Sequence, residues 1–103
     1  MRGSRTGRPL MAALDLLGRR WTLRIVWELS HGATGFRDLQ ARCDGMSASV
    51  LATRLRDLQG ATLAEPAPEG WALTALGHDL VGALGPLNSW SERWAGQLPS
   101  DSQ

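Results

Sequence analysis

Residues 47–60 read SASVLATRLRDLQG, and this stretch is the most informative part of the chain for the fold. Its apolar side chains recur at helical spacing, so it predicts an amphipathic helix that is capped by Ser47 and closed by Gly60. The inner stripe of this helix consists of Val50, Leu51, Leu55 and Leu58. The opposite face carries small and polar residues, namely Ala48, Ser49, Ala52, Thr53 and Arg56.

Further helices are expected upstream of this stretch. Pro9 fits the first turn of a helix that Gly18 ends, because a proline at that position gives up no helical hydrogen bond. A second helix is expected from about residue 20 to residue 30, and Thr34 is the expected N-cap of a third helix. The Asp44-Gly45 pair is typical of a turn, so the third helix and the 47–60 helix should lie on either side of it.

Downstream, residues 62–74 have a different character. Prolines and Gly70 separate two short apolar stretches, which predicts a hairpin of short strands. Thr74 is the expected N-cap of the next helix, and the Gly85-Pro86 pair is expected to break that helix. A last helix would then carry Leu87, Trp90 and Trp94.

This order of elements defines the expected fold class. Helix, turn, helix and then hairpin is the order of a winged helix-turn-helix. The chain has 103 residues, which suits one domain with one hydrophobic core. We therefore expect a mainly α fold with a small β-hairpin. The expected parts are a flexible N-terminal arm over residues 1–8, the winged helix-turn-helix domain with its dimerisation helices over 9–96, and a flexible tail over 97–103.

Composition and charge restrict the location and the kind of partner that we expect for this protein. No apolar run is long enough to cross a bilayer, and residues 1–9 are too polar for a secretory signal, so we expect a cytoplasmic protein with no membrane partner. The formal net charge is only +1, but it is unevenly spread. Residues 1–60 hold an excess of arginine and residues 61–103 an excess of acidic residues, so the first part is the one suited to a polyanion.

The sequence shows no combination of residues that is typical of a catalytic site. There is no Ser/His/acid set, no metal-ligand spacing and no phosphate-binding glycine loop, which argues against an enzyme and predicts no cofactor. His31 stands beside a helix-ending glycine and His78 in a first helical turn, so both should have surface or capping roles. Cys43 is the single cysteine, and its expected role is that of a buried structural thiol.

The 47–60 helix has the division of faces that a recognition helix needs. Such a helix packs one face on the core and presents the other to base edges in the major groove. The residues expected to contact or approach bases are Ser47, Ser49, Thr53 and Arg56. The residues expected to hold phosphates are Arg37, Arg42 and Arg54. The alternative is an ordinary amphipathic helix whose polar face is only solvated. The order of the predicted elements argues against this alternative.

Several short motifs follow one another along the chain in a characteristic order. They are ALDLLGRRWT at 13–22, Glu28-Leu29 before His31-Gly32, Phe36 to Leu39, the 47–58 stretch, Leu73-Thr74 before Gly77, and WSERW at 90–94. Together these stretches resemble the HxlR family of bacterial regulators over about residues 9–94. The resemblance implies a winged-helix fold, dimerisation through the N- and C-terminal helices, and operator binding.

The chain departs from the family pattern in two places. Members of the family commonly carry a cysteine just before the proline that opens the first helix, and in some of them that thiol senses electrophiles or oxidants. Here the position is Arg8, which puts such a mechanism in doubt. The family's wings tend to be longer and basic, whereas this one carries Glu65 and Glu69, so we expect the wing to add little to DNA affinity.

Apolar residues on the first and last helices exceed what one small domain needs, which predicts a two-fold symmetric dimer. The residues expected at its interface are Leu10, Ala13, Leu17, Leu84, Leu87, Trp90 and Trp94. The chain also holds 5 tryptophans, which suits core and interface positions. The alternative for these tryptophans is a small, flat aromatic effector held near the dimer seam.

The sequence thus predicts a sequence-specific transcriptional regulator, a repressor, that binds a near-palindromic operator in double-stranded DNA as a homodimer. One alternative is a winged-helix protein-interaction module without DNA binding, which the weak net charge and the acidic wing favour. Another is a ligand-sensing multidrug-type regulator. The arm with Arg2, Arg5 and Arg8 is expected to be disordered, and contact with a minor groove is its alternative role.

Overall fold

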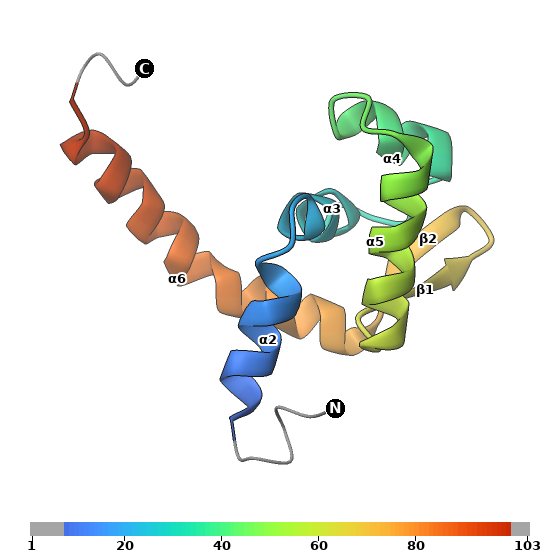
Figure 1. Ribbon diagram of the computed structural model, residues 1–103, viewed down its shortest axis with the longest axis horizontal. Coiled ribbons are helices and arrows are strands. Elements are labelled where there is room, and N and C mark those ends of the chain that lie inside the picture. The colour runs from blue at the N-terminus through green and yellow to red at the C-terminus, as the bar shows by residue number, and fades with distance from the viewer. Residues whose placement is uncertain (1–7, 100–103) are drawn as a thin grey trace.

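The computed structural model describes residues 8–99, and the predicted arm and tail lie largely outside this range. Figure 1 shows a small helical body from which one long helix projects. The elements, in order, are α2 (Pro9–Leu17), α3 (Thr22–Leu29), α4 (Phe36–Arg42), α5 (Ala48–Gly60), β1 (Ala64–Ala67), β2 (Gly70–Leu73) and α6 (Ala75–Gln97). The winged helix-turn-helix order predicted from the sequence is confirmed.

The hydrophobic core lies between α3, α4, α5 and the hairpin. Its fully buried residues include Ile25, Val26, Leu29, Leu39, Cys43, Leu51, Leu55 and Leu58. Three members of the predicted inner stripe of α5 are therefore in the core, and Val50 packs against it half-buried. Because this stripe is buried, the polar face of α5 must point away from the core.

The hairpin is antiparallel, with Ala64 opposite Leu73 and Ala67 opposite Gly70. Thr34 adds an isolated bridge to it, since its N–H and its carbonyl each bond to the backbone of Trp71 at 2.9 Å. The prediction of Thr34 as the N-cap of α4 is wrong, because Gly35 holds that position. Local sequence could not show this, since the backbone partner of Thr34 lies far along the chain.

The predicted break at Gly85-Pro86 is also wrong. α6 runs without interruption from Ala75 to Gln97 with Pro86 inside it. Proline removes one helical N–H and leaves the carbonyl of Gly82 without its helical donor. Both residues are exposed, so water can bond to that carbonyl, and the helix continues (Figure 1). The half of α6 beyond Pro86 projects from the body of the fold.

The start of the second helix needs a smaller correction. α3 begins at Thr22 and not near residue 20, because Trp21 has a left-handed backbone with φ of 77°. Gly18 ends α2, and Pro9 stands in its first turn, as predicted. No helix within residues 8–99 is long and apolar enough to cross a membrane.

Candidate nucleic-acid interface

The turn that joins α4 to α5 is held from inside. Asp44 and Gly45 both have positive φ, which confirms the predicted turn. Cys43 and Met46 on either side of it are buried, and the side-chain amide of Gln40 donates to the carbonyl of Met46 at 2.8 Å. These contacts fix where α5 begins relative to α4.

α5 begins with the cap that its sequence predicts. The Ser47 hydroxyl accepts the N–H of Val50 at 3.2 Å, which satisfies one of the free donors of the first turn. The Thr53 hydroxyl donates to the carbonyl of Ser49 at 2.9 Å, so its oxygen can still accept a bond from outside the helix. Ser47, Ser49 and Thr53 are all exposed. The start of α5 therefore presents hydroxyl groups to solvent beside the positive end of the helix dipole.

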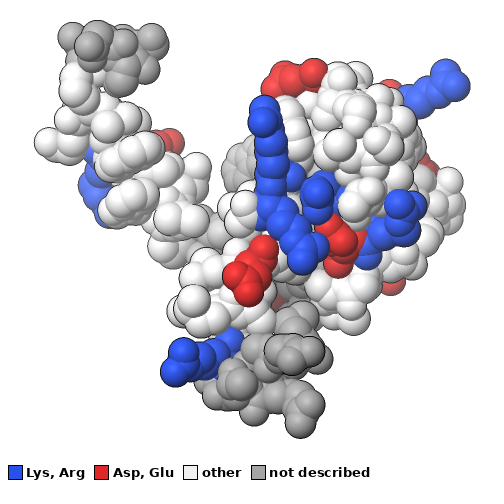
Figure 2. Space-filling model, viewed as in Figure 1, with Lys and Arg blue, Asp and Glu red and all other residues white. Residues whose placement is uncertain are grey.

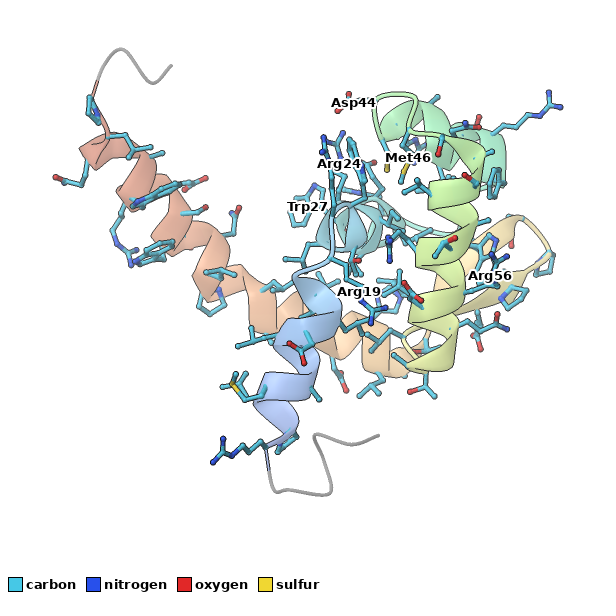
Figure 3. All side chains as sticks on the ribbon, viewed as in Figure 1. Arg19, Arg24, Trp27, Asp44, Met46 and Arg56 are labelled. Carbon is cyan, nitrogen blue, oxygen red and sulfur yellow. The ribbon has the colours of Figure 1, made fainter. Side chains whose placement is uncertain are left out.

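Arg56 extends this polar face. It is exposed and projects from α5 on the side of the hairpin (Figure 3). Arg37 and Arg42 on α4 are exposed too. None of these three guanidinium groups has a hydrogen bond or ion pair to another residue in the 8–99 range. They are free to contact an anion.

Arg54 differs from these three arginines. Its side chain is 23% exposed, and its Nη1 donates to Oδ2 of Asp57 at 2.6 Å. The same oxygen pairs with Nη1 of Arg19, from the turn between α2 and α3, at 3.0 Å. Arg54, predicted as a phosphate contact, is thus engaged inside the protein.

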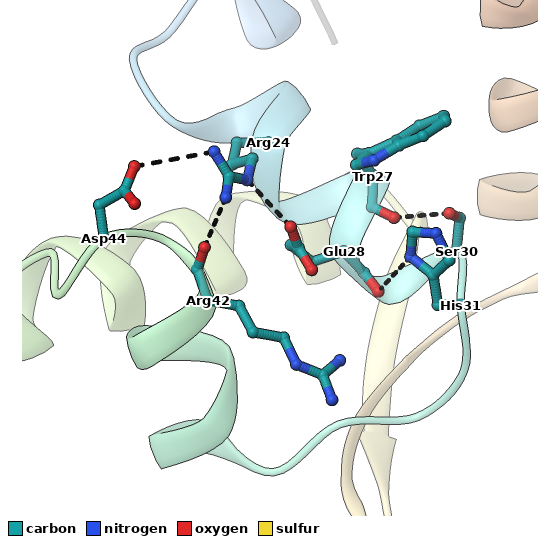
Figure 4. A network of polar contacts seen from close by, with 7 residues as sticks. All are labelled: Arg24, Trp27, Glu28, Ser30, His31, Arg42 and Asp44. Atoms are coloured by element: carbon teal, nitrogen blue, oxygen red, sulfur yellow. Dashed lines mark hydrogen bonds and ion pairs between the residues drawn. The ribbon is translucent and has the colours of Figure 1, made fainter.

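A second arginine network, around Arg24, was not singled out by the sequence reasoning (Figure 4). Its Nη2 donates to the carbonyl of Arg42, at the end of α4, at 2.6 Å. Its Nε bonds to Glu28 at 3.0 Å, and its Nη1 lies 3.8 Å from Asp44. The hydrogen bond to Glu28, with smaller contributions from neighbouring carboxylates, raises the pKa of Arg24. This network ties α3 to the end of α4.

The spacing of Arg24 and Glu28, four residues apart on one helix, was the one signal in the sequence for this network. The bond to the Arg42 carbonyl had no such signal, because it joins residues on different helices.

Cys43 is fully buried, which confirms the burial expected for this thiol. Burial is the main cause that raises the pKa of this thiol, and it outweighs the opposing effect of nearby Arg24. The neutral thiol is therefore the favoured form at neutral pH, and a buried neutral thiol reacts slowly.

The carboxylates of the wing and both histidines lie at the surface. Glu65 and Glu69 are exposed on the hairpin. His31 and His78 are exposed as well, and the His31 ring lies edge-on to Trp27 with 5.5 Å between the ring centroids. No group of three or more potential metal ligands occurs in the part of the chain that the structure describes.

α2 and α6 expose apolar surface. Leu10 is 67% exposed and Trp94 is 51% exposed, while Ala13, Leu17 and Leu84 are half-buried. The rings of Trp90 and Trp94 stack with 5.9 Å between centroids. Figure 2 shows the projecting part of α6 as mostly uncharged. Large exposed apolar side chains that the sequence reasoning did not place at an interface are Met11, Leu14, Trp27, Leu76 and Leu98.

This fold and this site define a winged helix-turn-helix transcriptional regulator. The model of the HxlR-like helix-turn-helix family matches residues 16–99, and the chain belongs to that family.

Individual relatives agree with this assignment. The chain is 32% identical to the HTH-type transcriptional regulator YvaP of Bacillus subtilis, over 80% of this chain and 82% of that protein. It is 34% identical to the HTH-type transcriptional regulator Rv3095 of Mycobacterium tuberculosis. That match covers 85% of this chain and 60% of the longer relative. Among solved structures, quinone-bound YodB of B. subtilis matches with a TM-score of 0.78 and 26% identity, over 82% of this chain and 97% of that one.

Proposed function

We propose that this protein is a repressor that binds a near-palindromic operator as a homodimer. The observation that carries the proposal is the exposed polar face of α5, which combines the hydroxyl groups of Ser47, Ser49 and Thr53 with the unpaired guanidinium of Arg56. A buried stripe on the opposite side holds this face outward. This is the arrangement with which a recognition helix enters the major groove.

The contacts with DNA divide into two kinds. Ser47, Ser49, Thr53 and Arg56 contact bases from α5, where an arginine can bond to guanine through two donors. Arg37 and Arg42 hold phosphates from α4, and these contacts carry no sequence information. Arg54 is a phosphate contact only after it leaves Asp57.

Dimerisation follows from the apolar surface of α2 and α6. Exposed residues such as Leu10, Leu87, Trp90 and Trp94 lie on helices that border the fold, and a second copy related by a two-fold axis would bury them. Two recognition helices about 34–36 Å apart would then enter successive major grooves, so the operator should repeat with inverted symmetry. A dimer seated across such a site blocks polymerase, which is why we propose repression.

The experiment is a mobility shift with the DNA upstream of the protein's own gene, combined with a salt titration and a random competitor. A sharp complex that survives the competitor supports the proposal and leads to a footprint of the operator. A complex that the competitor removes leaves generic DNA affinity only. No binding at low salt favours the protein-interaction module, and a pull-down with the intact protein would then be used to find its partner.

A ligand-sensing regulator is the second candidate. The stacked rings of Trp90 and Trp94 are about half exposed, and the related YodB is known in a quinone-bound form. A planar aromatic compound such as a quinone would stack on these rings near the dimer seam. Quenching of tryptophan fluorescence that Trp94→Leu abolishes would support this candidate, and unchanged fluorescence and melting temperature would oppose it for the compound tested.

A further inference from the structure

One carboxylate on the recognition helix pairs with two arginines. Oδ2 of Asp57 lies 2.6 Å from Nη1 of Arg54, one turn earlier on α5, and 3.0 Å from Nη1 of Arg19. The side chains of Asp57 and Arg54 are only 22% and 23% exposed, whereas that of Arg19 is 48% exposed. In Figure 2, basic side chains gather over α5 with acidic atoms between them.

This network lies beside the groups proposed to contact DNA. Asp57 is four residues after Thr53 on α5 and so lies one turn along the same face, and Arg19 reaches α5 from the turn after α2. Phosphate and carboxylate are the same kind of acceptor for a guanidinium, with oxygens that match its fork of donors. A phosphate brought to this face therefore meets two arginines that each already give an Nη1 donor to Asp57, and it also meets the negative charge of Asp57.

We propose that Asp57 competes with DNA phosphates for Arg54 and Arg19 and so sets the strength of sequence-independent DNA binding. This inference rests on the proposed function. A random duplex binds through phosphate contacts alone, so it loses the contribution of the two arginines while Asp57 holds them. The operator loses the same phosphate contribution but keeps its base contacts to Ser49, Thr53 and Arg56. Asp57 thus lowers the affinity for both duplexes by a similar factor, which releases the weakly bound random DNA while the operator complex remains.

The test is Asp57→Asn, which removes the charge but leaves the shape. We expect the Kd for a random duplex to fall by about tenfold, roughly the equivalent of one charge-assisted hydrogen bond. The salt dependence of that binding should steepen by about one to two units, and the operator Kd should fall by a similar factor, so that the ratio of the two affinities changes little. A variant that only loosened the fold would not steepen the salt dependence.

Two comparisons make this test specific. Asp15→Asn removes the same charge from an exposed residue of α2 that has no ion pair within the described part of the chain, and it should leave the random-duplex Kd within about twofold. In the Asp57→Asn background, Arg54→Gln or Arg19→Gln should each reverse about one unit of the steeper salt dependence. In the wild type the same arginine changes should have a smaller effect.

The outcomes separate this inference from the proposed function. If the protein binds DNA but Asp57→Asn behaves like Asp15→Asn, the role of Asp57 is overturned and the proposed function stands. If neither the wild type nor Asp57→Asn binds any duplex, both are overturned.

Should Asp57→Asn fail to fold, the wild type itself decides. The guanidinium NMR signals of Arg54 and Arg19 should stay nearly in place on addition of random duplex, because Asp57 holds them, while the signals of the unpaired Arg37 and Arg42 shift. Arg54 and Arg19 signals that shift as much as that of Arg37 would overturn the inference.

Discussion

The carbonyl oxygen of Leu63 lies against Gly77 at the place where a side chain would stand. The same carbonyl accepts the N–H of Thr74 at 3.0 Å, and the Thr74 hydroxyl accepts the N–H of Gly77 at 3.0 Å. Because these bonds fix the carbonyl, it cannot easily move away from residue 77. The start of α6 is thereby joined to the end of the α5–β1 connection at a contact that only glycine allows.

Gly77→Ala should therefore lower the free energy of unfolding by about 1–3 kcal/mol through overpacking. Gly82→Ala is the matched control, since it lies on the same helix with no atom within 4 Å of an added Cβ. That change should raise stability by about 0.5–1 kcal/mol, because alanine is the better helix former. Urea unfolding monitored by circular dichroism measures both, and two variants of equal stability would contradict the packing argument.

Arg56→Ala and Arg37→Ala should weaken DNA binding in different ways. Loss of Arg56 should relax the preference for bases at one position of the operator, by about 1–3 kcal/mol of discrimination. Loss of Arg37 should weaken binding to all sequences alike and reduce the salt slope by about one unit. Binding to a library of operator variants at two salt concentrations distinguishes them. An Arg56→Ala protein with unchanged affinity and preference would remove that residue from the base contacts.

Leu87→Glu should dissociate the proposed dimer, because each new charge would then lie in an apolar interface. Leu87 is exposed in the monomer, so the fold itself should tolerate the change. Leu76→Glu is the control, with a similarly exposed leucine in the first turn of the same helix. Sedimentation at micromolar concentration should show monomers for Leu87→Glu and dimers for the control. A wild type that sediments as a monomer would contradict the dimer.

Ionisation of the Cys43 thiol should lower the free energy of unfolding at alkaline pH. Its pKa in the folded protein is raised above the ordinary value of 9.0 by burial, so the unfolded chain loses its proton first as the pH rises. This contribution to the free energy of unfolding is present below about pH 9 and is lost progressively above it, with a slope of at most about 1.4 kcal/mol per pH unit. Cys43→Ala should remove this component of the pH dependence, as seen by urea unfolding between pH 8 and about 10.5. An identical alkaline slope in wild type and variant would contradict it.

Glu65→Ala and Glu69→Ala should each leave operator affinity unchanged or slightly improved. Both side chains are exposed on the wing, and a carboxylate near a phosphate repels it. Fluorescence anisotropy with a labelled operator measures the effect. Weaker binding by each variant would show that the acidic wing contributes to the complex.

Local pattern was enough for much of the fold. The stripe of α5, the caps at Ser47 and Thr74 and the hairpin around Gly70 depend on residues within a few positions of one another. The polar face of α5 followed directly, since a helix that buries one stripe must expose the other. The resemblance carried the family assignment, and a family model that matches residues 16–99 confirms it.

Other features depend on residues that only folding brings together. The bridge of Thr34 to Trp71, the bond from Arg24 to the Arg42 carbonyl and the two arginines on Asp57 join separate segments, and no periodicity records them. The continuity of α6 through Pro86 was not predicted. A proline inside a helix is unfavourable but does not have to end it where water can bond to the freed carbonyl. Local sequence pattern was therefore sufficient for most of the helices, the hairpin, the buried stripe of α5 and the family assignment. The tertiary structure decided which arginines are left unpaired, because a charge is free or engaged according to neighbours that are distant in the chain.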